Sequence, residues 1–113
     1  MSRRDDQTSL KDMRAHAREA IVLLNSGNLE DLSGNRTLQL ALTRLIEIIG
    51  EAAYRVTPEV KERHSNIPRG EIMGMRNRMI HGYDVLDISV LHNTITQDLP
   101  SLVAVLDEIL GNQ

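Results

Sequence analysis

The octet RNRMIHGY, residues 76–83, contains side chains that could act on a phosphate group. These are Arg76, His81 and Tyr83, with Asn77 and Arg78 between them. A guanidinium binds phosphate oxygens bidentately and stabilises charge that develops in a transition state. An imidazole exchanges a proton near neutral pH. The two groups together suit phosphoryl transfer. With RNA, the natural reaction is attack of a ribose 2′-hydroxyl on its own phosphate, which requires no metal ion.

The spacing also allows a purely structural interpretation. Arg76 and His81 are about 140° apart on an ideal helix, whereas Arg78 and His81 would be neighbours on one face. Basic residues in a last helical turn stabilise the helix dipole by about 0.3–1 kcal/mol. Spacing alone favours this role. It leaves open whether Tyr83 is a half-buried core residue or a site residue. It also leaves open whether Asn77 hydrogen-bonds the helix end or orients the arginine or a substrate.

The composition favours packed helices. The chain has 113 residues, which is the size of a single domain, here residues 1–113. It has no Trp and no Phe, and its aromatic residues are Tyr54 and Tyr83. The core must therefore consist of aliphatic side chains and methionine, which is typical of helix packing rather than of sheets. We expect an all-α fold.

Several classes of protein are disfavoured by the sequence. It has no cysteine, no apolar signal segment after MSRRDDQTSLKD, and no apolar run near the ~18 residues of a membrane span. Phosphate-binding glycine loops, HExxH and serine-nucleophile motifs are absent. We expect a cytoplasmic protein that has no membrane-spanning segment and uses no metal ion or cofactor. The net charge is −3, but residues 55–81 hold six basic and three acidic residues, which is compatible with a phosphate-bearing ligand.

The apolar periodicity predicts the helices that would position the octet. They cover residues 5 or 9 to 24, 36–56, 58–64, 68 to the octet, and 87–109, with a short turn at LEDL. Gly50 indicates close approach of another helix, Gly82 would follow the octet helix as its C′ residue, and Pro100 should kink or break the last helix. The economical arrangement is an antiparallel bundle of four to five helices.

Other polar residues are expected on helix surfaces. Arg14 and Arg18 fall opposite the apolar stripe of the first helix. On the 36–56 helix, the spacing predicts weak surface ion pairs Arg44–Glu47 and Glu51–Arg55. The histidines outside the octet are expected at surfaces or helix ends; they are His16, His64 and His92.

The octet resembles the R-x4-H-x-Y signature of HepT-like HEPN-domain proteins, with Arg76, His81 and Tyr83 in its three fixed places. These proteins are the toxin half of type II HepT–MNT toxin–antitoxin modules. The resemblance extends to IEIIGEAAYRVTPEVKERHSNIP, IMGMRN and TQDLPSLVAVLDEIL, and so covers about residues 38–110. Two positions depart from the family: Arg69 replaces a common Trp, and Asp84 an aromatic residue after the motif tyrosine.

The resemblance implies a HEPN-like helical homodimer in which two motifs meet in a shared cleft. It implies a metal-independent ribonuclease toxin in which Arg76 stabilises the phosphate and His81 transfers the proton or positions the 2′-hydroxyl. Asn77 would support this geometry, with Arg78 beside it. An MNT-type nucleotidyltransferase antitoxin would attach AMP to Tyr83 and so silence the toxin, because a phosphate-rich adduct would block a basic cleft.

Two further hypotheses compete with the ribonuclease. One is a non-catalytic helical binding module that docks a minimal nucleotidyltransferase or a nucleotide, and the other is a purely structural dimer. The presence of Arg76, His81 and Tyr83 together with a local basic excess favours cleavage.

Overall fold

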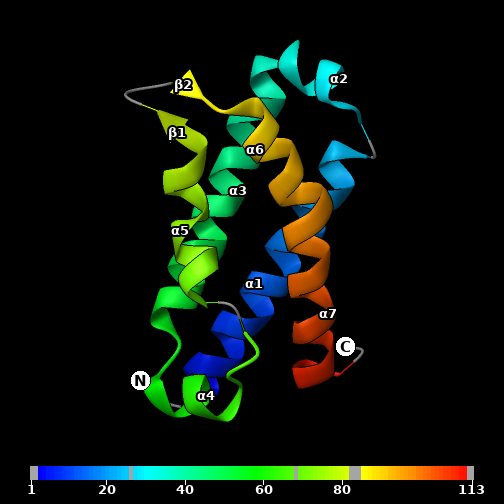
Figure 1. Ribbon diagram of the computed structural model, residues 1–113. Helices are drawn as coiled ribbons and strands as arrows, with labels where there is room; N and C mark the ends of the chain where they lie inside the picture. Colours follow the sequence, from blue (N-terminus) through cyan, green and yellow to red (C-terminus); the bar gives the residue numbers. More distant parts are fainter. Residues whose placement is uncertain (1–2, 26, 68, 82–84, 112–113) are drawn as a thin grey trace.

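The computed structural model describes residues 3–25, 27–67, 69–81 and 85–111. The long helices are α1 (Arg3–Leu24), α3 (Arg36–Arg55), α5 (Arg69–Met79) and α7 (Leu99–Leu110). The short elements are α2 (Leu29–Ser33), α4 (Pro58–Arg63), α6 (Ile88–Asn93), the π-helical turn η1 (Thr94–Asp98), and the strands β1 (Ile80–His81) and β2 (Val85–Leu86). Figure 1 shows the four long helices running alternately up and down.

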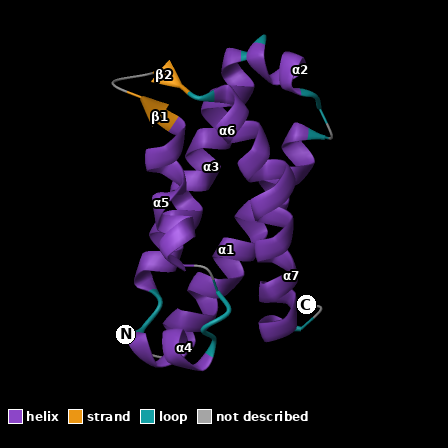
Figure 2. Ribbon diagram, in the orientation of Figure 1, coloured by secondary structure: helices purple, strands orange, loops and turns teal. Residues whose placement is uncertain are grey.

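The predicted all-α bundle is confirmed, with one small addition. Helices form nearly all of the described chain, and the only strands within the described ranges are the two residues each of β1 and β2, drawn as orange arrows in Figure 2. The short helices α2 and α4 close opposite ends of the bundle (Figure 1). The hairpin of β1 and β2 lies at the same end as α2, where α5 leads into α6.

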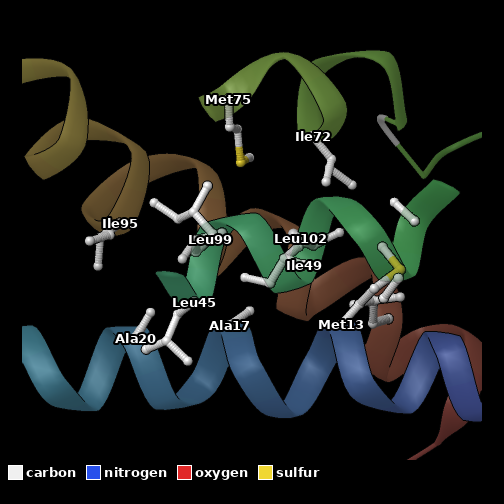
Figure 3. Packing of buried hydrophobic residues seen from close by; sticks show 14 of the residues in the cluster. Met13, Ala17, Ala20, Leu45, Ile49, Ile72, Met75, Ile95, Leu99 and Leu102 are labelled. Atoms are coloured by element: carbon white, nitrogen blue, oxygen red, sulfur yellow. The ribbon is translucent and has the colours of Figure 1, made fainter. Parts of the chain in front are cut away.

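The core lies where α1 meets α3 and α7 and where α3 meets α5 (Figure 3). The side of α1 that faces this core carries an apolar stripe at helical spacing, formed by Leu10, Met13, Ala17, Ala20 and Leu24, all buried. The alanines in this stripe allow the helix backbones to approach closely. Leu45 and Ile49 of α3 and Leu99 and Leu102 of α7 complete the same cluster. The core is aliphatic, as the composition predicted.

Helix starts follow the capping signals in the sequence. Asn28 and Asp31 form a reciprocal capping box at the start of α2. The Asn35 side chain accepts a hydrogen bond from the Leu38 amide at the start of α3, and Asp87 accepts one from the Val90 amide at the start of α6.

Thr57 occupies the N-cap position of α4, but its side chain does not cap that helix. Its hydroxyl donates to Oδ2 of Asp6 at 2.6 Å, and its amide donates to Oδ1 of the same carboxylate at 2.8 Å. Asp6, on α1, is only 4% exposed. A carboxylate 51 residues away in the sequence therefore anchors the start of α4, which local capping rules do not predict.

The expected break at Pro100 takes the form of a π-helical turn. Residues 94–98 have π-helical hydrogen bonding, and the amide of Leu99 donates to the carbonyl of Thr94, five residues earlier. Pro100 has no N–H to donate to Thr96, so the regular α-helical ladder cannot pass through this point. The wider turn accommodates the missing donor and keeps Ile95, Leu99 and Leu102 buried.

The placement of Arg14 on the solvent side of the first helix was wrong. Arg14 is 5% exposed, and its guanidinium donates to Oδ1 of Asp107 at 3.1 Å and to the carbonyl of Gly111 at 2.7 Å. Arg18, as expected, is exposed, and it donates to the same Asp107 oxygen at 2.7 Å. The carbonyl at the end of α7 and a carboxylate one turn earlier supply the polar partners that make burial of a guanidinium tolerable. Periodicity within α1 cannot reveal those partners.

Candidate functional site

The helix that carries most of the octet is held against α3 by a buried stripe. Ile72, Met75 and Met79 are each at most 2% exposed, and they recur at helical spacing on one side of α5. Asn77 and Arg78 are exposed. Packing of the stripe therefore fixes α5 and leaves two polar residues of the octet facing solvent.

The octet helix ends earlier than the sequence indicated. α5 stops at Met79, and the chain continues into β1, where Ile80 pairs with Leu86 and His81 pairs with Val85. The amide of Asp87 donates to the carbonyl of Met79 at 2.6 Å, which closes the end of the helix. His81 therefore lies in a strand and not in a last helical turn. The prediction that this helix extends as far as Gly82, its C′ residue, was wrong.

Two consequences follow for the predicted site. The predicted neighbouring of Arg78 and His81 on one helix face was wrong, because only Arg78 is in the helix. The separation of about 140° between Arg76 and His81 assumed one continuous helix. It does not apply, because His81 is in the strand β1. The dipole-stabilising role loses its basis for His81, which is beyond the helix end. Arg76 lies in the last turn of α5, three residues before Met79.

Part of the predicted site lies outside what the structure describes. Gly82, Tyr83 and Asp84, which connect β1 to β2, lie outside the described residues. For Arg76 and His81 the description covers the backbone and not the side chains. The meeting of Arg76, His81 and Tyr83 in one site therefore stays a prediction.

Another helix passes Gly50, as the sequence suggested, but at a distance that leaves room for a Cβ. A Cβ added at Gly50 would lie 3.9 Å from the carbonyl oxygen of Ile72. A methyl group at this position would make an ordinary van der Waals contact with the backbone of α5. The helix that carries the octet therefore passes Gly50 without a steric need for glycine.

A groove borders this contact, and sequence reasoning missed it. It has a volume of about 450 Å³ and lies between α3 and α5. Its lining consists of Ile46, Glu47, Gly50, Glu51, Tyr54, Arg55 and Ile72. Tyr54 is 74% exposed although it is one of only two aromatic residues in the chain. Tyr54 lies outside the apolar stripe of α3, and this was the sequence feature that could have indicated the groove.

The polar face of α3 has an ion pair that the sequence spacing did not predict. Arg44 contacts Glu51 at 3.4 Å, across seven residues, and both side chains are about 60% exposed, at 60% and 59%. Two helical turns bring residues seven apart onto the same face. An exposed pair of this kind contributes only about 0–1 kcal/mol. It leaves the Glu51 carboxylate accessible from the groove.

The histidines outside the octet have ordinary structural surroundings. His16 Nδ1 donates to the carbonyl of Asp12 at 2.7 Å, and His64 follows the last residue of α4. His92 Nε2 donates to the carbonyl of Gly27 at 2.9 Å, which ties α6 to the loop before α2. These placements match the predicted surface and helix-end positions, with His92 half-buried.

No group of three or more His, Cys, Asp or Glu residues in the described ranges could hold a metal ion. None of the helices in this part of the chain combines the length and apolar character needed to cross a membrane.

Comparison with known proteins identifies relatives along nearly the whole chain. The protein named "Probable ribonuclease HepT" from Thermococcus cleftensis is 37% identical over 98 residues, which cover 83% of this chain and 89% of that protein. "Putative RNase MJ1380" from Methanocaldococcus jannaschii is 30% identical over 102 residues, 90% of this chain and 94% of that protein. No solved structure shows significant similarity to the chain.

The family assignment agrees with these relatives. The family described as Ribonuclease HepT-like matches residues 10–109, from the first buried leucine of α1 to the last turn of α7. This span includes the whole octet and both helices that border the groove. The resemblance read from the octet is confirmed at the level of the family: the chain belongs to the ribonuclease HepT-like family.

Proposed function

We propose that the protein is a metal-independent endoribonuclease that cleaves RNA by attack of a ribose 2′-hydroxyl. The observation that carries this proposal is the family match over residues 10–109, together with an octet that retains Arg76, His81 and Tyr83. The position of His81 beyond the end of α5 supports it. Arg76 is in the helix and His81 is in the following strand, so helix geometry does not hold the two residues on different faces.

In the proposed reaction, the His81 imidazole accepts the proton of the 2′-hydroxyl. The 2′-oxygen then forms a bond to the adjacent phosphorus, and the bond from phosphorus to the 5′-oxygen breaks. The leaving 5′-oxygen takes up a proton from water, and the protonated His81 imidazole then returns its proton to the solvent. The products are a 2′,3′-cyclic phosphate and a 5′-hydroxyl, and the Arg76 guanidinium stabilises the added charge on the phosphate. Asn77 and Arg78, both exposed, would contact the RNA backbone.

The active unit in this proposal is a homodimer. The two octets would face one another in a shared cleft, so that each chain completes the site of the other. RNA would lie in that cleft, where the basic residues of the 55–81 region favour phosphate. The partner that regulates the enzyme would be an MNT-type nucleotidyltransferase, which transfers AMP to Tyr83 and blocks the cleft with negative charge. Together the two proteins would form a toxin–antitoxin pair.

The deciding experiment compares His81→Ala with wild type on a single-stranded RNA. We expect cleavage to fall by about 10²–10⁴-fold, the usual contribution of an acid–base group. Wild-type products should end in a 2′,3′-cyclic phosphate. His16→Ala is the matched control, because His16 contacts only its own helix through Asp12 in the described structure and lies outside the octet. Circular dichroism should give the same helix content for all three proteins.

Two results would reject the proposal. Undiminished cleavage by His81→Ala would remove His81 from the mechanism. If purified wild-type protein binds RNA or nucleotide but leaves RNA intact, the protein is a binding module and not a ribonuclease.

A further inference from the structure

We infer that the groove between α3 and α5 is a base-binding subsite that holds one guanine of the RNA substrate. Its lining residues are Ile46, Glu47, Gly50, Glu51, Tyr54, Arg55 and Ile72. The inference rests on the proposed ribonuclease function and deepens it, because it names the site and the base through which RNA is selected.

The groove lies beside the octet. Ile72 belongs both to the groove lining and to the buried stripe of α5, and Arg76 follows it by four residues on the same helix. Four residues advance the helix by about 6 Å, roughly one turn. A base bound at Ile72 would therefore be close enough for a nearby phosphate of the same strand to reach the octet.

The shape of the groove suits a flat ring. Its volume of about 450 Å³ lies within the range of small-molecule sites, about 300–1,000 Å³. Ile46 and Ile72 are each 1% exposed and provide an apolar floor, and Gly50 adds no side chain between them. The Tyr54 ring, 74% exposed, borders this floor. Single-stranded RNA is commonly held by stacking of its bases on exposed aromatic rings.

The aromatic content of the chain strengthens this assignment. The sequence has no Trp and no Phe, so Tyr54 and Tyr83 offer its largest rings for base stacking. Tyr83 belongs to the octet, where the proposed addition of AMP would occur. Tyr54 is the tyrosine that lines the groove and could hold a base away from the reacting phosphate.

The Glu51 carboxylate selects the base. Glu51 lines the groove beside Glu47, and the exposed pair between Glu51 and Arg44, at 3.4 Å, is weak enough for a ligand to compete with it. A carboxylate accepts two parallel N–H bonds. Guanine presents N1–H and its 2-amino group as adjacent donors. Adenine and cytosine place an acceptor beside their donor, and uracil has one donor between two carbonyls, so only guanine matches both carboxylate oxygens.

The test is nucleotide binding to the full-length protein, which does not depend on cleavage. Backbone amide shifts are followed by NMR during titration with guanosine, adenosine, cytidine and uridine 5′-monophosphates. We expect the shifts to centre on Gly50, Glu51 and Tyr54. Guanosine monophosphate should saturate them at the lowest concentration.

Substitutions separate stacking from base selection. Tyr54→Ala should weaken guanosine monophosphate binding by at least about fivefold, the lower end of base–aromatic stacking, whereas Tyr54→Phe should retain it. Glu51→Gln should remove the preference for guanine over adenine, since an amide cannot accept both N–H groups. Leu29→Ala is the control, because Leu29 is an exposed apolar residue on α2, outside the groove. In RNA cleavage, Tyr54→Ala should raise KM with little change in kcat.

Three results would overturn the inference. Equal affinity for the four nucleotides would remove the role of the Glu51 carboxylate. Shifts confined to residues outside the groove would place the base elsewhere. Loss of dimers by Tyr54→Ala in light scattering, with nucleotide binding unchanged, would make the groove a surface for self-association. Binding of guanosine monophosphate in the groove by a protein that cleaves no RNA would support the subsite and reject the ribonuclease.

Discussion

Gly50 of α3 faces the carbonyl oxygen of Ile72 of α5, and a Cβ at Gly50 would lie 3.9 Å from that oxygen. At this point the helix that carries Arg76 packs against α3 with room left for a methyl group. Both residues also line the groove in which we place the guanine. One pair of residues thus links the packing of the bundle to the proposed recognition of RNA.

The first prediction concerns the stability of Gly50→Ala. A contact of 3.9 Å leaves room for a methyl group, and alanine has the higher helix propensity. We expect the free energy of unfolding to rise by about 0.5–1 kcal/mol. Urea denaturation followed by circular dichroism measures it. A fall in stability would mean that α3 and α5 pack more tightly at this point than the 3.9 Å contact indicates.

The second prediction compares two arginines that share Asp107. Arg14 is 5% exposed and also donates to the carbonyl of Gly111, so Arg14→Ala should lower the free energy of unfolding by about 1.5–3 kcal/mol. Arg18 has a side chain that is 46% exposed, so Arg18→Ala should cost only about 0–1 kcal/mol. Denaturation of both variants under one condition gives the comparison. Equal losses would show that burial of Arg14 adds nothing to its ion pair.

The third prediction concerns Arg76 and metal ions. Arg76→Ala should reduce RNA cleavage as strongly as His81→Ala, because both groups act on the same phosphate in the proposed reaction. Treatment of the wild type with EDTA should leave the rate unchanged, since 2′-hydroxyl attack uses no metal. Rates are measured on labelled RNA with and without the chelator. Activity lost in EDTA and recovered with Mg²⁺ would contradict the mechanism.

The fourth prediction separates cleavage from its regulation. Tyr83→Phe should keep RNA cleavage, because no step of the proposed reaction uses the hydroxyl. It should resist the addition of AMP by a nucleotidyltransferase with ATP, because the acceptor oxygen is gone. Intact-mass spectrometry detects the adduct, and an RNA assay follows the loss of activity. Silencing of the variant to the wild-type extent would refute Tyr83 as the point of control.

The sequence by itself determined the helices and their order. Apolar residues at helical spacing and the missing donor at Pro100 are local signals. Each depends on a few neighbouring residues, and each predicted an element or break that the structure contains. The octet was likewise recognisable from the sequence because its residue types and order are distinctive.

Tertiary structure alone decided the features that depend on contacts between distant residues. Burial of Arg14 requires Asp107 and Gly111, the start of α4 requires Asp6, and the end of α5 at Met79 requires strand pairing with Val85 and Leu86. The groove needs two helices to come together before it exists. Periodicity describes one helix at a time, so it places a residue on a face without showing what that face meets.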